Sequence, residues 1–414
     1  MNDKDKFKWL KIDLRIPLLN ILKDKMPRGR EELKYREPLK HIKFREVNGK
    51  KHIIFICYYP GIDFIKKSIV LRKSNKYYTT FIGCCIREDV EILRWFDEAY
   101  EVTHYREFYD LLKDADPWAV YVQIPLVEMA AIIIDSLPQH VKIILNVYDT
   151  QLFILPEDSF LCRLERELYK RVHCLTHKMP SEAIEEMRNV WDIKCKDFFI
   201  LSLPCKDFFI NPDVEEKLKK KWSIVFAGGV MPYHIALKRG CGNHIFDPII
   251  CSLNEQNIKF TIYVNQNARN MYWEEHKRYF DMQDRLLNFK FRPGYPFFRL
   301  PEKIANFHFG LIYDNISACS FNKKHFKYNM ATKMFSYLEA GLPLLVYEEA
   351  EFMKEIVVKN NLGIIYDLNR LDSINKLLQK NDYVELCKNV INFRDRFSLE
   401  KNLFKLQQSL DSVL

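Results

Sequence analysis

An apolar run in the second half of the chain, Ser223–Val230, contains a pair of glycines, Gly228 and Gly229. Glycines directly after a strand let the chain turn sharply and let a ligand approach the backbone closely. A helix is expected to begin near Asn243 or Phe246, and the N–H groups at a helix start attract phosphate oxygens. The segment could therefore hold a phosphate group, although a glycine pair after a strand is also an ordinary turn.

A lysine stands where a helix is expected to start in the segment Asn329–Val346. The apolar spacing of this segment predicts a helix that begins at Lys333 and stops at Gly341. A cation in the first turn of a helix opposes the helix dipole. Lys333 therefore indicates an anionic partner in front of it, and the alternative is a lysine that is simply exposed.

A third segment, Phe289–Pro296, predicts a short strand that breaks into a turn. Tyr295 and Pro296 in that turn could flank a nucleobase, because an aromatic face and exposed backbone groups suit a flat heterocycle. The alternative is a turn with a half-buried tyrosine. Together, the three segments are compatible with a ligand that carries both phosphate and a base.

The first half of the chain offers groups that could accept a proton. Asp149 follows the apolar run Val141–Tyr148, and His177 follows a second run. A carboxylate or an imidazole at such a position could act as a general base toward a hydroxyl group. Asp149 is the first choice and His177 the second, and Asp149 could instead cap a helix or a turn. Further positions expected at the same edge of the sheet are Tyr59–Gly61, Arg87–Glu88 and Gln123.

Short apolar runs alternate with segments of helical spacing from Lys51 onward, which predicts parallel, doubly wound α/β domains. The runs expected as strands of the first domain are His52–Tyr58, Tyr78–Cys85, Tyr100–Tyr105, Trp118–Ile124, Val141–Tyr148, His173–Thr176 and Phe198–Leu203. Those expected in the second domain are Trp222–Ala227, Phe260–Val264, Phe289–Phe291, Phe309–Tyr313, Leu344–Tyr347 and Gly363–Tyr366. Ligands of open α/β sheets bind at the carboxyl ends of the strands, so two such domains in tandem predict a central cleft.

The pattern divides the chain into four parts. Residues 1–50 form a basic extension, and residues 51–212 form the first α/β domain. A charged stretch, Asp213–Lys221, is interpreted as a linker or a short exposed helix. Residues 221–381 form the second α/β domain, and residues 382–414 are expected to be helical.

The net charge of +9 belongs almost entirely to the N-terminal extension. Residues 1–51 hold sixteen Lys and Arg against eight Asp and Glu, and the other residues hold 48 against 47. Helical spacing in the extension joins Phe7, Leu10, Leu14, Leu18 and Ile21. Pro17 is expected to kink or split this helix. The helix would either pack on the first domain or contact an anionic membrane surface, and the neutral body argues against a nucleic acid partner.

The overall composition is that of a globular protein, with 48% hydrophobic and 29% charged residues. The eleven cysteines include no Cys-x-x-Cys pair, which favours a reducing compartment. No signal peptide is apparent, and no apolar run reaches the roughly 18 residues needed to span a bilayer. We therefore expect a cytoplasmic protein, with peripheral contact to the inner face of the cell membrane through residues 1–45.

The run Lys327–Asp367 (KYNMATKMFSYLEAGLPLLVYEEAEFMKEIVVKNNLGIIYD) resembles the donor-binding region of GT-B glycosyltransferases of the family 4-like group. That group carries a lysine, a hydrophobic-Glu-Tyr-Leu-Ala-Ala-Gly-x-Pro segment, a strand and a helix with a glutamate. Supporting similarities are FAGG at the glycine pair, HFGLIYDN (His308–Asn315) and LERELYKRVHCLTHKMPSEAIEEM (Leu164–Met187). The resemblance covers most of residues 52–370, and its specific part is Lys333–Pro343.

The resemblance implies a role for each matching position. Gly228 and Gly229 would approach the diphosphate of a nucleotide sugar, and Lys333 would pair with it. Tyr295 and Pro296 would lie beside the base.

The chain departs from the family at two glutamates that stand eight residues apart. They would fall on Tyr328 and Ser336, and neither residue is acidic. The second glutamate normally binds the donor ribose, for which Ser336 offers only a hydroxyl group. Glu339 lies one helical turn further on and could substitute, since residues three apart share a helix face.

The resemblance implies a GT-B glycosyltransferase, which would move a sugar from a nucleotide diphosphate sugar to a saccharide or lipid-linked saccharide in surface polysaccharide or glycoconjugate synthesis. The second domain would bind this donor, the first the acceptor, and residues 382–414 would cross back to the first. No metal or other cofactor is expected, because basic side chains and helix dipoles can stabilise the leaving diphosphate. Two alternatives stay open: a degenerate GT-B protein that only binds, and a nucleotide-sugar epimerase.

Overall fold

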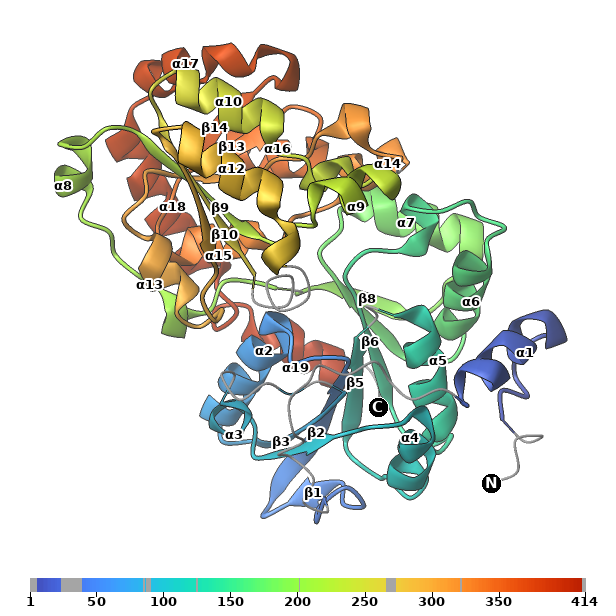
Figure 1. The fold of residues 1–414 in the computed structure, drawn as a ribbon. Coiled ribbons are helices and arrows are strands. Elements are labelled where there is room, and N and C mark those ends of the chain that lie inside the picture. The colour runs from blue at the N-terminus through green and yellow to red at the C-terminus, as the bar shows by residue number, and fades with distance from the viewer. Residues whose placement is uncertain are drawn as a thin grey trace. The chain divides into compact units, whose positions relative to one another are not determined.

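The computed structural model describes residues 6–23, 39–84, 86, 91–123, 126–200, 202–265, 273–320 and 322–411. Arg87–Glu88 and residues 24–38 of the extension lie outside the described residues. The chain forms two compact units (Figure 1). Unit 1 comprises Met1–Ser202 and Asn402–Leu414, and unit 2 comprises Leu203–Lys401.

The sheet of unit 1 has the strand order β4-β3-β2-β5-β6-β7-β8, and neighbouring strands on this path are parallel. The strands are β2 (Lys50–Cys57), β3 (Tyr77–Gly83), β4 (Glu98–Glu101), β5 (Ala119–Gln123), β6 (Ile143–Val147), β7 (Cys174–His177) and β8 (Lys196–Phe199). A two-residue strand, β1 (Glu46–Val47), pairs antiparallel with β2. Counted from β2, the first six parallel strands follow the order 3-2-1-4-5-6 of doubly wound domains, with the switch point between β2 and β5.

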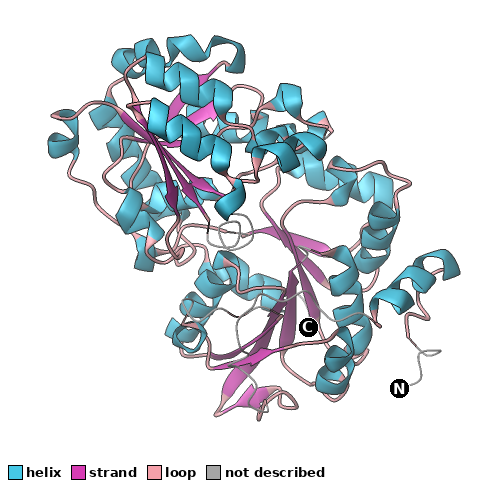
Figure 2. Cartoon of the chain, viewed as in Figure 1, coloured by secondary structure: helices cyan, strands magenta, loops and turns pink. Residues whose placement is uncertain are grey.

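Helices pack around this sheet (Figure 2). They are α2 (Ile62–Lys73), α3 (Ile92–Trp95), α4 (Tyr105–Leu112), α5 (Val127–Ser136), α6 (Phe160–Tyr169), α7 (Ser181–Trp191) and α19 (Leu403–Asp411), with a 3-10 turn η3 (Gln151–Phe153). The central strands β2, β5 and β6 are almost continuously buried, as expected when helices cover a parallel sheet. The C-terminal helix α19 belongs to this unit, and the hydroxyl groups of Ser409 and Tyr121 are 2.8 Å apart.

The N-terminal extension contributes the helix α1 (Ile12–Ile21), which packs against α6. Leu14 and Leu18 on one face of α1 are buried, and Arg163 of α6 pairs with Asp13 at 2.5 Å. The expectation that Pro17 splits this helix is wrong, because α1 continues through Pro17. Burial of the two leucines holds the helix together across the missing N–H group.

The sheet of unit 2 has the order β11-β10-β9-β12-β13-β14 and is parallel throughout. The strands are β9 (Ser223–Gly228), β10 (Lys259–Val264), β11 (Phe289–Pro293), β12 (Phe309–Leu311), β13 (Leu344–Tyr347) and β14 (Gly363–Tyr366). The order is again 3-2-1-4-5-6, and the switch point lies between β9 and β12. The predicted fold class, two doubly wound α/β domains, is therefore confirmed.

The helices of unit 2 include two that matter for the site, α10 (Asp247–Glu255) and α15 (Lys333–Glu339). The others are α8 (Val214–Leu218), α9 (Tyr233–Lys238), α12 (Lys277–Arg285), α13 (Leu300–Ile304), α14 (Lys323–Tyr328), α16 (Glu351–Asn360), α17 (Ile374–Lys380) and α18 (Tyr383–Phe397). Short 3-10 turns are η4 (Lys206–Phe208), η5 (Gly242–His244), η6 (Trp273–Glu275), η7 (Ile316–Ala318) and η8 (Leu368–Ser373).

The chain passes into unit 2 at Leu203, before the boundary at residue 212 that the sequence pattern indicates. The backbone N–H of Ile210 donates to the carbonyl of Glu339 at 2.8 Å, and Arg394 Nη1 donates to the carbonyl of Ile210 at 2.6 Å. Arg394 is only 2% exposed, so these bonds lie in the interior of unit 2. They attach the segment 203–212 to α15 and α18.

In the described part of the chain, no helix has the length and apolar character that crossing a membrane requires. The described cysteines are free thiols, most of them buried.

Candidate functional site

Lys333 and Gly228, which are far apart in the sequence, come together in unit 2. Gly228 is the last residue of β9, and Lys333 is the first residue of α15. A Cβ atom added to Gly228 would lie 3.2 Å from Cε of Lys333, so the glycine leaves room for the lysine side chain. The ammonium group of Lys333 lies 4.5 Å from the ring centroid of Phe226. Burial of Met334 and Phe335 in α15 fixes the direction of this lysine.

Two polar residues that sequence reasoning missed, His244 and Asn265, lie beside Gly229. Nδ1 of His244 is 3.2 Å from the carbonyl oxygen of Gly229. That oxygen can only accept, so Nδ1 carries the proton. The side-chain nitrogen of Asn265 lies 3.5 Å from the place of a Cβ atom on Gly229. We call Gly228, Gly229, His244, Asn265 and Lys333 the glycine-turn site.

The electrostatics of the glycine-turn site favour an anion. Burial, and after it the positive charge of Lys333, lowers the pKa of His244 to about 4. His244 is therefore neutral at pH 7 and acts as a hydrogen-bonding group. Lys333 is the cation of the site, and its position at the carboxyl end of β9 adjoins the switch point of the sheet, where α/β domains bind ligands.

The turn with Tyr295 and Pro296 follows β11, which pairs with β10 and is the second strand from β9 in the sheet. The N–H of Gly294 donates to the carbonyl of Val264 at 2.6 Å, and a Cβ atom on Gly294 would lie only 2.3 Å from that oxygen. Only glycine allows this approach, which places the turn against the end of β10. Tyr295 is 38% exposed, and its ring centroid is 5.5 Å from that of Tyr263. An exposed aromatic face thus lies at the same sheet edge as the glycine-turn site.

Ser336 and Glu339 both lie in α15 and are buried, at 6% and 0% exposed. One carboxylate oxygen of Glu339 accepts the backbone N–H of Cys205 at 2.8 Å. Glu339 thus fastens the first segment of unit 2 to α15. The role of ribose ligand that the resemblance implies for Glu339 would have to use the other carboxylate oxygen and stays a prediction.

Asp149 follows β6 in unit 1, and its side chain is 39% exposed. One of its carboxylate oxygens is 3.4 Å from the ammonium nitrogen of Lys178, whose side chain is only 3% exposed. The carboxylate thus contacts a buried cation on one side, and its exposed part can meet a hydroxyl group. This geometry suits a general base.

His177, the second candidate base, is buried at the end of β7, and both of its ring nitrogens are engaged. Nε2 is 3.0 Å from a carboxylate oxygen of Asp197, and Nδ1 is 3.2 Å from the backbone nitrogen of Met179. The hydrogen bond from His177 lowers the pKa of Asp197. Proton transfer to His177 would require one of these bonds to be given up, so Asp149 stays the first choice and the role of His177 stays a prediction.

The switch point of unit 1 adds a buried polar cluster that sequence reasoning missed. Asp63 and Lys67 of α2 form an ion pair and share hydrogen bonds with Asn146 of β6. The backbone N–H of Ser202, the last residue of this part of unit 1, also donates to Asp63. The signal in the sequence is the Asp–Lys spacing of four residues, which places both side chains on one helix face.

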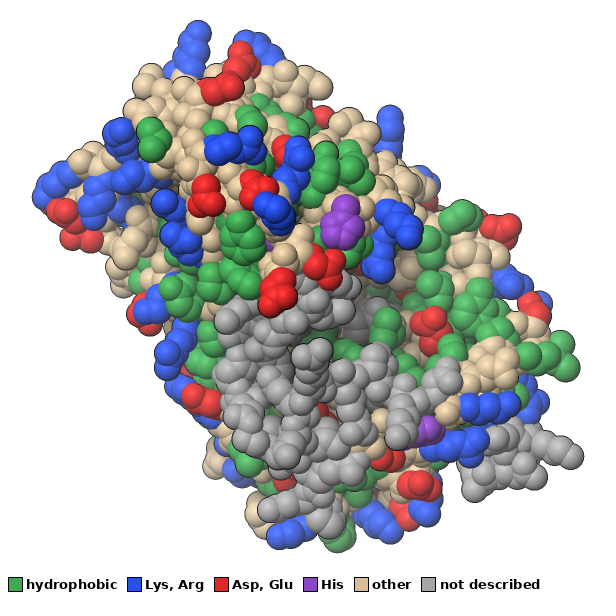
Figure 3. Space-filling model, in the orientation of Figure 1, with side chains coloured by type: hydrophobic (Ala, Val, Ile, Leu, Met, Phe, Trp, Pro, Cys, Tyr) green, Lys and Arg blue, Asp and Glu red, His purple; other side chains and the backbone are tan. Residues whose placement is uncertain are grey.

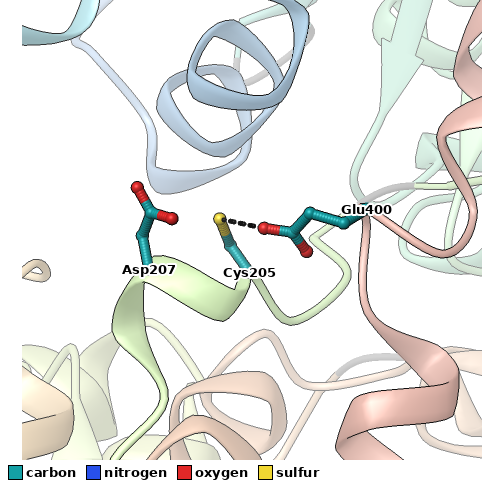
Figure 4. Close-up of side chains that lie close together, drawn as sticks. All are labelled: Cys205, Asp207 and Glu400. Carbon is teal, nitrogen blue, oxygen red and sulfur yellow. Dashed lines mark hydrogen bonds between the residues drawn. The ribbon is translucent and has the colours of Figure 1, made fainter. Parts of the chain in front are cut away.

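A second polar group, Cys205, Asp207 and Glu400 in unit 2, has the donor atoms that a metal site needs (Figure 4). One atom from each side chain lies within 4.8 Å of the others. The carboxylate of Glu400 accepts the thiol of Cys205 at 3.3 Å and the backbone N–H of Lys206 at 2.9 Å. These bonds tie together the two places where the chain enters and leaves unit 2.

Basic and acidic side chains are interspersed on the visible face of the molecule (Figure 3). This agrees with the nearly neutral body that the charge count gives. Selectivity for an anion must therefore come from a few placed groups, and Lys333 is such a group among the described residues at the switch point of unit 2.

The comparisons with known proteins agree with this geometry. Residues 253–405 match the family model described as glucosyltransferase 3-like, C-terminal domain. A comparison with curated proteins gives no match.

Solved structures show the same architecture over most of the chain. Sucrose-phosphate synthase from Thermosynechococcus elongatus has a TM-score of 0.56 at 8% identity, covering 88% of this chain and 100% of that chain. HepE from Anabaena, in complex with UDP and glucose, has a TM-score of 0.60 at 10% identity, covering 87% and 99%. Trehalose-6-phosphate synthase, OtsA, has a TM-score of 0.55 at 9% identity, covering 88% and 100%. The solved structures thus show the two-domain GT-B fold for this chain, and residues 253–405 match the glucosyltransferase 3-like C-terminal domain.

Proposed function

We propose that this glycosyltransferase moves a sugar from a UDP-sugar held by unit 2 to a saccharide or lipid-linked saccharide held by unit 1. The observation that carries the proposal is the contact of Lys333 with the glycine turn at Gly228, at the switch point of the second sheet. The HepE structures with UDP and glucose and with UDP-glucose support the choice of uridine. The role in surface polysaccharide or glycoconjugate synthesis is part of the same proposal.

The proposed chemical step uses one carboxylate of unit 1 and the glycine-turn site of unit 2. The acceptor hydroxyl oxygen bonds to the anomeric carbon, the bond from that carbon to the diphosphate breaks, and UDP leaves with the electron pair. The hydroxyl proton passes to the carboxylate of Asp149. Lys333 and the N–H groups at Gly228 and Gly229 stabilise the charge that develops on the diphosphate.

The proposal is tested by a turnover screen of the full-length protein across UDP-, GDP-, ADP- and CMP-sugars, with released nucleotide as the readout. We expect release of UDP from at least one UDP-sugar, and faster release when saccharide acceptors are added. A protein that binds nucleotide sugar without turnover would support the degenerate binding protein instead. Interconversion of the sugar without release of UDP would support the epimerase.

Metal removal is expected to leave the transfer rate unchanged. The charge of the leaving diphosphate is met by Lys333, so the step needs no divalent cation. The measurement is UDP release in excess EDTA compared with the same assay in MgCl2. A rate that collapses in EDTA and returns with a divalent cation would contradict this part of the proposal.

We propose that α1 brings the enzyme to an anionic membrane surface where a lipid-linked acceptor is presented. Ile12 and Ile16, one helical turn apart, are 75% and 54% exposed, while Leu14 and Leu18 hold the helix on unit 1. Exposed lysines also flank α1 in the sequence, namely Lys8, Lys11 and Lys23. Each lysine near an anionic leaflet contributes about 1 kcal/mol, and burial of each isoleucine adds roughly 1.5–3 kcal/mol.

The double variant Ile12→Ser/Ile16→Ser is expected to bind phosphatidylserine-containing vesicles more than tenfold more weakly in a cosedimentation assay. The matched control is Leu93→Ser/Leu287→Ser, which removes leucines that are 57% and 93% exposed elsewhere. Equal binding by the two double variants would contradict the assignment of α1 as the membrane contact.

A further inference from the structure

We infer that Glu165 is a positioning residue for Asp149: its buried carboxylate fixes the turn that carries Asp149, and this sets how fast the acceptor is deprotonated. The inference rests on the proposed function, because it assigns Asp149 as the base. Glu165 lies in α6 and is 0% exposed. It does not reach the solvent or any ligand itself.

The contacts of Glu165 converge on the turn after β6. One carboxylate oxygen accepts the backbone N–H of Gln151 at 2.7 Å, two residues after Asp149. The other accepts the hydroxyl group of Tyr169, and the hydroxyl group of Thr150 also bonds to the carboxylate. The donors thus come from the two residues that directly follow Asp149 and from α6 itself. Charge-assisted bonds of this kind are about twice as strong as neutral ones.

Holding this turn with a buried carboxylate costs free energy, because a charge is removed from water. Burial raises the pKa of Glu165 and the negative charge of Asp149 adds to this, while hydrogen bonds lower it, so that the pKa lies at about 7. A neutral side chain of the same shape would avoid the cost of burying a charge. The charge is retained at a turn that presents the candidate base, and this indicates a functional use for it.

The surroundings contain no cation in direct contact with Glu165 among the described residues. The ionisable groups on the elements packed around it are Asp149 in the turn, Cys162, Arg163, Arg166, Glu167 and Tyr169 in α6, Lys178 after β7, Glu128 and Asp135 in α5, and Asp13 and Arg15 in α1. Lys178 pairs with Asp149, Asp135 accepts from Trp9, and Asp13 pairs with Arg163. Glu165 is thus held by hydrogen-bond donors, and its protonation state governs how firmly it holds the turn.

The sign of the pH dependence follows from the raised pKa. The folded protein binds the proton of Glu165 more tightly than the unfolded chain, so ionisation makes a destabilising contribution that grows as pH rises from about 4.5 to about 7. In the folded protein the carboxylate ionises around pH 7, and there the ionised form tightens the turn. The free energy of unfolding therefore falls between about pH 4.5 and 7, and the transfer rate rises around pH 7.

The experiment measures transfer rate, UDP affinity and thermal unfolding of Glu165→Gln between pH 5 and pH 8.5. Glutamine keeps an acceptor for the N–H of Gln151 and removes the charge. At pH 8 we expect a transfer rate about tenfold lower than wild type, a higher melting temperature and an unchanged UDP affinity. At pH 5 the two proteins are expected to converge in rate and in melting temperature. The matched control is Glu167→Gln, on the same helix, whose carboxylate pairs with Lys170 at 2.7 Å.

The outcomes separate a positioning role from a structural one. If Glu165 had a merely structural role, Glu165→Gln would lower the transfer rate and the melting temperature together. The two losses would then be the same at pH 5 and at pH 8. A wild-type rate in Glu165→Gln at pH 8 would overturn the inference. If Glu165→Gln matches wild type while Asp149→Asn loses transfer, the inference fails and the proposed function stands. If Asp149→Asn also keeps full transfer, the assignment of the base itself fails.

Discussion

Asp149→Asn is expected to lower the rate of sugar transfer by about 10²–10⁴-fold, the usual contribution of a general base. Asparagine has nearly the shape of aspartate and cannot take the proton of the acceptor hydroxyl. UDP affinity should not change, because the glycine-turn site belongs to unit 2 and Asp149 to unit 1. The measurement is product formation under saturating donor, with UDP affinity determined by calorimetry on the same preparation.

The variant also leaves Lys178, which is buried, without its carboxylate partner. Thermal unfolding is therefore measured alongside the rate, so that a misfolded sample is recognised. The control is Asp192→Asn, at a carboxylate that is 83% exposed and at a positive φ of 52°, a conformation that asparagine tolerates well. Full transfer activity in folded Asp149→Asn would rule out the assignment of this base.

Lys333→Ala is expected to lower kcat/KM for the donor by about 10²–10³-fold, or roughly 3–4 kcal/mol of transition-state stabilisation. Lys333 is the cation beside Gly228, and its charge is needed most when the diphosphate leaves. The control is Lys354→Ala, an exposed lysine of the same unit that pairs with Glu348 at 3.2 Å. Equal kcat/KM in the two variants would show that the donor diphosphate lies elsewhere.

The same variant has a second, independent consequence. Lys333 is one of the causes that hold the pKa of His244 near 4, after burial itself. Removing its positive charge is therefore expected to raise the pKa of His244, although burial keeps it below the usual value. The measurement is an NMR titration of the histidine ring in both proteins. An unchanged pKa would mean that the two side chains are farther apart than the structure places them.

The strands of both domains could be predicted because buried parallel strands are continuous apolar runs. The exceptions include β1, whose two residues are too few to form a pattern. The runs predicted at Tyr100–Tyr105 and Phe198–Leu203 overlap β4 and β8 by only two residues each, because these two strands are not continuously buried. The hexapeptide CKDFFI shows more clearly what a local sequence cannot predict. It occurs at Cys195–Ile200 and again at Cys205–Ile210. The first copy contains β8 and the second contains the 3-10 turn η4. Identical residues thus adopt different structures because their tertiary partners differ, which no local pattern contains.

The residues of the candidate site likewise differ in how far a local sequence pattern could identify them. Gly228, Lys333 and Gly341 could be placed from the sequence, because glycines and helix starts have local signatures. Asn265 had a weak signal, since it directly follows a strand, and His244 had none. The roles expected for His177 and Glu339 depended on which way their side chains point. Burial and bonds to Asp197 and Cys205 decide that direction, and these partners come from distant parts of the chain.

The central claim is that UDP binds at the glycine turn of unit 2, and hydrogen exchange of the full-length protein with and without UDP tests it most directly. Amide exchange reports local opening, so a bound nucleotide slows it where the backbone is held. We predict protection at residues 226–230, at 243–245 and at 331–335, with none along β2 and β5 of unit 1. Protection confined to unit 1, or no protection anywhere at saturating UDP, would contradict the account.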